Sequence, residues 1–122
     1  MKNIALFPGS FDPVTRGHES IIRRALPLFD RIIIAIGQNS EKQTLFSIEQ
    51  RITWMNEIFR NETKINIQKY TGLTVEFCKT MNANYILRGL RTMADFEFER
   101  TIGTMNKMLY PGVETIFLIS SP

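Results

Sequence analysis

An unbroken apolar run, IIIAI at residues 32–36, lies in the middle of this chain and has the length of a β-strand. A strand with one face in water alternates apolar and polar residues, whereas a strand covered on both faces is apolar throughout. This run therefore predicts a strand of a parallel sheet that has helices on both sides. It is the longest apolar run of the chain and falls far short of the roughly 20 residues that span a bilayer, so no membrane partner is expected.

Strand and helix patterns alternate along the whole chain. Strands are predicted at 3–7, 31–37, 64–70, 84–89 and 114–120, and helices at 17–29, 47–61, 73–82 and 93–110, with Pro27 expected to shorten or kink the end of the first helix. This alternation predicts the α/β class, as one Rossmann-like, doubly wound domain over residues 1–122. Its sheet is expected to have five parallel strands in the order 3-2-1-4-5, with helices on both faces.

The two most unusual segments, PGSFDPVTRGH (8–18) and RGLR (88–91), follow the first and the fourth predicted strand. These strands are neighbours in a sheet of that order, although about 70 residues separate them. Ligands of such sheets bind outside the carboxyl ends of the strands at the point where the strand order reverses. We therefore expect both segments to meet in one ligand site.

Charge and cysteine content narrow the class of ligand. The net charge is +3, and the basic residues are scattered, which fits small anions such as nucleotides and does not favour a nucleic-acid partner. A single cysteine, Cys78, gives no disulfide framework and no zinc cluster, and fits a reducing cytoplasm. Cys78 and the pair Met105 and Met108 are expected in a core or a subunit contact.

Three common functional motifs are absent from the sequence: GxxxxGK[ST], GxGxxG and HExxH. Their absence argues against a P-loop enzyme, a dinucleotide-binding protein and a zinc protease.

His18, the only histidine, falls in the first turn of a predicted helix, directly after turn-forming residues. A helix N-terminus attracts phosphate, and an imidazole there can donate to the bound anion. The alternative is an ordinary surface or capping histidine. Ser10 has the same two interpretations, as a phosphate donor or as a turn serine, and Asp12 is expected to organise the turn.

Arg88 and Arg91 flank a glycine at the end of the fourth strand, and arginine binds phosphate through a planar fork. Alternatively they pair with acids such as Asp95 and Glu99, and the two interpretations are compatible. Lys42 lies in the loop after the second strand, where a lysine is most often just solvated.

Three segments in this order, FPGSFDPVTRGH, Lys42 in SEKQTLF, and LRGLRTMADFEFE, resemble the bacterial phosphopantetheine adenylyltransferases of the nucleotidylyltransferase superfamily. The resemblance runs from Met1 to Pro122. It implies transfer of the adenylyl group of ATP to 4′-phosphopantetheine, which gives dephospho-coenzyme A and pyrophosphate in the penultimate step of coenzyme A synthesis. It also implies Mg²⁺ as cofactor, a cytoplasmic location and a homohexamer.

The resemblance further implies roles for individual residues. It makes His18 a stabiliser of the transition state, with Lys42 and Arg91 as further catalytic cations. The residues expected to bind phosphopantetheine are Ser10, Lys42, Thr74 and Arg88. The residues expected to bind ATP are Ser10, Phe11, His18, Gly89, Leu90, Arg91 and Glu99. No protein side chain is expected to bind the metal, because the ATP phosphates would hold it.

Two departures from the family pattern qualify these expectations. Ser10 stands where the family usually has threonine, and the hydroxyl group is kept. The family has a further helix after the last strand that contacts ATP; these 122 residues do not include it, so an incomplete ATP site is expected. Two alternatives therefore stay open: another small-molecule nucleotidylyltransferase, or a truncated, non-catalytic nucleotide-binding relative.

Overall fold

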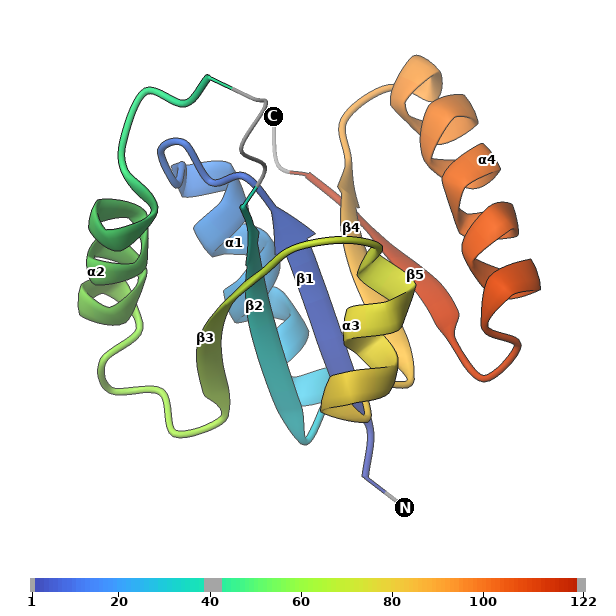
Figure 1. The fold of residues 1–122 in the computed structure, drawn as a ribbon, viewed down its shortest axis with the longest axis horizontal. Coiled ribbons are helices and arrows are strands. Elements are labelled where there is room, and N and C mark those ends of the chain that lie inside the picture. The colour runs from blue at the N-terminus through green and yellow to red at the C-terminus, as the bar shows by residue number, and fades with distance from the viewer. Residues whose placement is uncertain (1, 39–42, 121–122) are drawn as a thin grey trace.

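A five-stranded parallel sheet in the order β3-β2-β1-β4-β5 organises the computed structural model, which describes residues 2–38 and 43–120 (Figure 1). The strands are β1 (Ile4–Gly9), β2 (Arg31–Gly37), β3 (Ile65–Tyr70), β4 (Tyr85–Leu90) and β5 (Glu114–Ile119). The helices are α1 (Arg16–Ala25), the 3₁₀-helix η1 (Leu26–Leu28), α2 (Ile48–Ile58), α3 (Thr74–Met81) and α4 (Met93–Leu109). The predicted class, strand number and strand order are thereby confirmed.

The apolar strand β2 is covered on both faces, as its composition predicts. Ile32, Ile34 and Ile36 pack in one cluster with buried residues of α1 and α2. Ile33 and Ala35 pack in a second cluster, on the other face, with residues of α3. None of these five side chains is more than 1% exposed. The alternation of strand side chains thus sends neighbouring residues into two separate cores.

Three element boundaries differ from the prediction by more than one residue, and one of them is the end of α2, which stops at Ile58 and not at residue 61. Strand β1 runs on to Gly9, two residues past the expected end, because Pro8 and Gly9 keep the register with Ala35 and Ile36 of β2. Helix α1 ends at Ala25, and the 3₁₀-helix η1 takes over from Leu26, so a helix that continues to Phe29 is wrong. Pro27 in η1 lacks the N–H that a continuing α-helix needs, and the expected shortening is confirmed.

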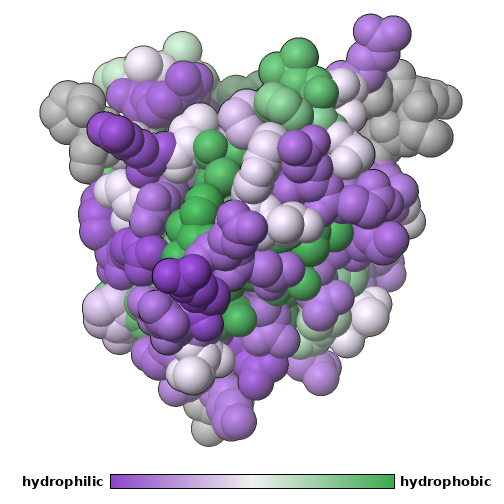
Figure 2. Space-filling view, turned by 90° about the vertical axis from the view of Figure 1, so that its left-hand side faces the viewer, coloured by the Kyte–Doolittle hydropathy of each residue, from purple (hydrophilic) through white to green (hydrophobic). Residues whose placement is uncertain are grey.

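Helix α4 differs from the other helices because it buries only Glu99. Its exposed apolar side chains include Phe98, Met105 and Met108, which are 67%, 57% and 78% exposed. A core position for the two methionines is therefore wrong, while the subunit-contact interpretation stays a prediction. Figure 2 shows the opposite side of the molecule, around α2 and β3, which is mostly hydrophilic apart from a band and a small cluster of apolar atoms.

Cys78 is fully buried in the second core cluster, which confirms a core position. Burial raises the pKa of its thiol to about 12, so the group stays protonated and unreactive at neutral pH. Within residues 2–38 and 43–120, none of the helices has the length and apolar character that a membrane span requires.

Candidate functional site

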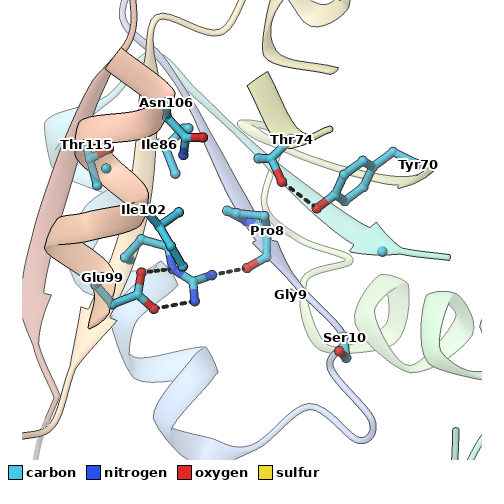
Figure 3. Close-up of a pocket in the computed structure, with 13 residues that line it drawn as sticks. Pro8, Gly9, Ser10, Tyr70, Thr74, Ile86, Glu99, Ile102, Asn106 and Thr115 are labelled. Carbon is cyan, nitrogen blue, oxygen red and sulfur yellow. Dashed lines mark hydrogen bonds and ion pairs between the residues drawn. The ribbon is translucent and has the colours of Figure 1, made fainter. Parts of the chain in front are cut away.

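Two cavities open at the carboxyl ends of β1 and β4, where the predicted ligand site was expected. The larger, of about 740 Å³, is lined by the β1–α1 loop, the start of α1 and the residues that follow β4. The smaller, of about 270 Å³, lies between α4, the start of α3 and the sheet (Figure 3). The residues that line both cavities are Pro8, Gly9, Ser10, Arg88 and Glu99. The two distant segments therefore meet at one edge of the sheet.

His18 is both a capping residue and a wall of the larger cavity. Thr15 is the N-cap of α1, and its hydroxyl accepts a hydrogen bond from the backbone N–H of His18 at 3.2 Å. In return, Nδ1 of His18 accepts the backbone N–H of Thr15 at 3.0 Å. The two interpretations of His18 from the sequence are compatible, because the capped imidazole still lines the cavity.

The surroundings of His18 favour the uncharged imidazole. Burial is the main cause that lowers its pKa from the usual 6.5, and the positive charge of Arg88 lowers it further. His18 is therefore neutral at pH 7, with one ring N–H to donate.

Phe11 shapes the site through its ring. The residue has a φ of 48° and is 3% exposed. Its ring meets that of His18 edge to face, with centroids 4.9 Å apart. A Cβ on Gly9 would lie 2.9 Å from the Phe11 ring, so only glycine leaves room for it. Phe11 lines the larger cavity, although little of its surface is exposed.

Asp12 and Arg51 tie the β1–α1 loop to the segment before α2. The carboxylate of Asp12 accepts the backbone N–H groups of Leu45 and Phe46 at 2.7 and 2.9 Å, which confirms its structural role. Arg51 is 4% exposed, and its guanidinium donates to the carbonyls of Ser10 at 2.8 Å and Phe46 at 3.1 Å. The loop that carries Ser10 is thus held from two directions.

Sequence analysis missed Arg51. A signal for Arg51 exists, because it follows Ile48 by three residues and precedes Met55 by four, on the buried face of α2. An arginine at such a position must find hydrogen-bond partners inside the fold. Here those partners are backbone carbonyls.

Replacing Arg51 with methionine is expected to lower the free energy of unfolding by about 1–3 kcal/mol, because it removes the hydrogen bonds that the buried guanidinium donates to the carbonyls of Ser10 and Phe46. Denaturant unfolding at constant m value measures the change. The matched control is Arg24→Met, at an exposed position of α1, which should change little. Equal losses in both variants would contradict the role of Arg51.

Arg88 is anchored in the wall that the two cavities share. Its Nε and Nη2 donate to the two carboxylate oxygens of Glu99 at 3.0 and 2.7 Å, and Nη1 donates to the carbonyl of Pro8 at 2.7 Å (Figure 3). Within the described part of the chain these three bonds use three of the five N–H donors of a guanidinium. The predicted pairing with Glu99 is confirmed, and donors remain for an anion.

Arg91 also pairs with its predicted acidic partner, Asp95, but this ion pair is exposed to solvent. Its Nε donates to Asp95 at 3.1 Å, and its side chain is 77% exposed. The hydrogen bond from the Arg91 side chain is the main cause that lowers the pKa of Asp95. Both residues line the larger cavity.

The remaining predicted residues divide between the two cavities. Thr74 lines the smaller one, and its hydroxyl lies 3.0 Å from that of Tyr70. Gly89 lines the larger one. Leu90 is half-buried and lines neither cavity among the described residues, so no cavity contact supports its predicted role. Lys42 lies outside the described residues.

The arrangement suits binding of anions better than covalent catalysis. Two arginines, a neutral imidazole and the N-terminus of α1 surround the larger cavity. The carboxylates of Asp12, Asp95 and Glu99 are all hydrogen-bonded to backbone or arginine. In residues 2–38 and 43–120, no group of three or more His, Cys, Asp or Glu residues is placed to hold a metal ion.

Comparison with known proteins agrees with this geometry. Residues 6–117 match the model of the cytidylyltransferase-like family. A phosphopantetheine adenylyltransferase of Christiangramia forsetii is 56% identical over 96% of this chain and 77% of its own length. Proteins of the same name from Leptospira biflexa and Cytophaga hutchinsonii are 52% and 48% identical, over 98% and 100% of this chain and 75% and 81% of their own lengths.

Solved structures share the fold at lower identity. A nicotinic acid mononucleotide adenylyltransferase of Plasmodium falciparum, complexed with APC, aligns with a TM-score of 0.73 and 22% identity, over 98% of this chain and 64% of that one. A putative nicotinate-nucleotide adenylyltransferase of Vibrio parahaemolyticus aligns with a TM-score of 0.71 and 16% identity, over 100% and 76%. These alignments support the fold alone.

Proposed function

The chain belongs to the phosphopantetheine adenylyltransferases of the cytidylyltransferase-like family, and on that premise we propose that it transfers the adenylyl group of ATP to 4′-phosphopantetheine. The products are dephospho-coenzyme A and pyrophosphate. The main structural support for this activity is a pair of cavities that share a wall containing Arg88, where two phosphate-bearing ligands can be brought together.

The two cavities suit the two substrates. Besides the shared Arg88 and Glu99, the smaller one is lined by neutral polar and apolar residues, among them Thr74, Ile102 and Asn106, which suit an uncharged pantetheine arm with amide groups (Figure 3). The larger one is wide, and its cations and helix N-terminus suit a triphosphate. The acceptor phosphate and the α-phosphate of ATP would then meet near Ser10 and Arg88.

The reaction needs positioning and charge stabilisation. An oxygen of the acceptor phosphate forms a bond to the α-phosphorus of ATP, and the bond from that phosphorus to the bridging oxygen of the pyrophosphate breaks. The residues named above need to align two anions and neutralise the charge that grows on the transferring group. In this proposal His18 donates to that group, Arg88 holds the acceptor phosphate, and Lys42 and Arg91 add positive charge. A nucleophilic side chain is not required.

Magnesium is proposed to enter with ATP. The carboxylates of the larger cavity are engaged by Arg88, Arg91 and backbone N–H groups, so they are poorly suited to serve as a ligand set. The phosphate oxygens of ATP supply the hard ligands that Mg²⁺ prefers. The chain's own residues would then bind the phosphates and leave the ion to them.

A pyrophosphate-release assay tests the function. With ATP, Mg²⁺ and 4′-phosphopantetheine, release is expected, and it should stop when the metal is chelated. Nicotinamide mononucleotide and glycerol phosphate serve as control acceptors. Release with one of these instead would select another nucleotidylyltransferase activity, and ATP binding without release would select the non-catalytic alternative.

A cytoplasmic homohexamer is part of the proposal. Support comes from an apolar stripe on α4, defined as Phe98, Ile102, Met105 and Leu109, whose members recur at helical spacing. These side chains are between 37% and 67% exposed in the single chain. An exposed apolar stripe of this kind is typical of a protein–protein contact.

Replacing Phe98 with glutamate is expected to lower the molecular mass in solution, because a charge in the stripe must be desolvated when copies associate. Light scattering coupled to size-exclusion chromatography measures the mass. The control is Leu28→Glu, which places the same charge at an exposed apolar position of η1 and should leave the mass unchanged. If Leu28→Glu lowered the mass and Phe98→Glu did not, the apolar stripe on α4 would not be the contact between copies.

A further inference from the structure

Nδ1 of His18 faces two hydrogen-bond donors that belong to the same residue. The backbone N–H of Thr15 donates to it at 3.0 Å. The hydroxyl of Thr15 lies 3.1 Å from it, while the hydroxyl oxygen accepts the backbone N–H of His18 at 3.2 Å. A hydroxyl that accepts one bond still has its own proton to donate, here toward Nδ1.

These contacts decide where the imidazole carries its proton. A backbone N–H can only donate, so Nδ1 must present a lone pair to Thr15. The proton of the neutral ring is then on Nε2. A second proton on Nδ1 would point at the N–H of Thr15 and break the capping box at the start of α1.

The ring is also fixed in orientation by aromatic neighbours. Phe11 and Phe7 meet it edge to face, with centroids 4.9 and 6.5 Å away. Gly9 leaves the room that the Phe11 ring needs. Rotation of the imidazole would therefore disturb both the cap and the aromatic packing.

We propose that Thr15 is a positioning residue whose backbone N–H holds His18 as the neutral Nε2–H tautomer and whose hydroxyl fixes the orientation of the ring, so that Nε2, and not Nδ1, is the donor available to the transferring phosphoryl group. The catalytic half of this statement rests on the proposed function. The tautomer itself does not, because it follows from contacts within the free protein.

The pH dependence follows from the charges around the ring. The charged groups that line the same cavity are Asp12, Arg88, Arg91, Asp95 and Glu99. Burial and Arg88 lower the pKa of His18, and protonation would also break the contact with Thr15. The unfolded chain therefore binds this proton more readily, so the contribution of His18 to stability is fully present above pH 6.5 and is lost as the pH falls below it. Turnover should not depend on His18 titration above that pH.

Nitrogen-15 NMR tests the tautomer directly, because the chain has one histidine and its two ring nitrogens give unambiguous signals. The expected spectrum has a proton-bearing Nε2 and a proton-free Nδ1 throughout the range above pH 6.5, with a titration midpoint below 6.5. A proton on Nδ1, an averaged signal from exchanging tautomers, or a midpoint above 6.5 would overturn the proposal.

Two variants test the role of Thr15 in positioning. Thr15→Ser keeps the hydroxyl and should keep the spectrum and kcat. Thr15→Ala removes the hydroxyl but keeps the backbone N–H, so the Nε2–H tautomer should remain while the ring is held less firmly. The expected result is about a 10-fold lower kcat, less than the ~10²–10³-fold expected for loss of a whole donor, with KM for ATP little changed. An unchanged kcat in Thr15→Ala, or a change in KM alone, would overturn the role. If Thr15→Ala does not fold, the proposal is judged from the wild-type spectrum and from the spectrum and kcat of Thr15→Ser. Absent turnover in all forms with the expected spectrum would instead contradict the proposed function.

Discussion

Replacing His18 with alanine is expected to lower kcat by about 10²–10³-fold, the usual cost of removing one donor from a site of developing negative charge. The affinity for ATP should fall much less. The reason is that a donor aimed at the transferring group gains most when charge builds up there, whereas Arg88, Arg91 and the α1 N-terminus remain to hold the ground-state phosphates. Steady-state kinetics, with calorimetric titration of ATP, separate the two effects.

Two conservative variants sharpen this test. In His18→Asn the amide oxygen can still accept the N–H of Thr15, but the side chain is too short to place a donor at the position of Nε2. In His18→Gln the longer amide can place an N–H near that position. The glutamine variant should therefore retain more turnover than the asparagine variant, while both keep the fold. Equal losses of kcat and ATP affinity would show that His18 only binds substrate.

The sheet order could be predicted because the strand and helix patterns that limit it are local in the sequence. The run at 32–36 requires cover on both faces, and alternating strands and helices of ordinary length leave few topologies. The convergence of residues 8–18 with residues 88–91 follows from that order alone. The pairing of Arg88 with Glu99 could also be predicted, because the two residues are only eleven positions apart.

The contacts that position the site could not be predicted in the same way. Arg51 reaches the carbonyl of Ser10 across 41 residues, and Asp12 reaches the N–H of Leu45 across 33. Backbone carbonyls and N–H groups carry no sequence signature, so only the fold shows which of them a buried side chain meets. The positive φ of Phe11 and the space that Gly9 leaves for its ring likewise depend on tertiary packing.

Replacing Arg88 with methionine is expected to remove activity and to lower the free energy of unfolding by about 2–4 kcal/mol, since breaking a buried ion pair leaves a charge without compensation. The side chain of Glu99 is only 11% exposed, and Arg88 donates to both of its carboxylate oxygens. The carbonyl of Pro8 loses its donor as well. The expected loss of unfolding free energy is smaller than for a fully buried ion pair because the Arg88 side chain is 32% exposed.

The neighbouring arginine provides the matched control for Arg88. Arg91 pairs with Asp95 in the open, so Arg91→Met should lower kcat while leaving the free energy of unfolding little changed. The double variant Arg88→Met/Glu99→Gln should recover part of the stability that Arg88→Met loses, without recovery of turnover. Denaturant unfolding and pyrophosphate release, measured on the same preparations, compare the two quantities. If turnover returned together with stability in the double variant, Arg88 would only hold the fold, and the phosphate would have to bind elsewhere.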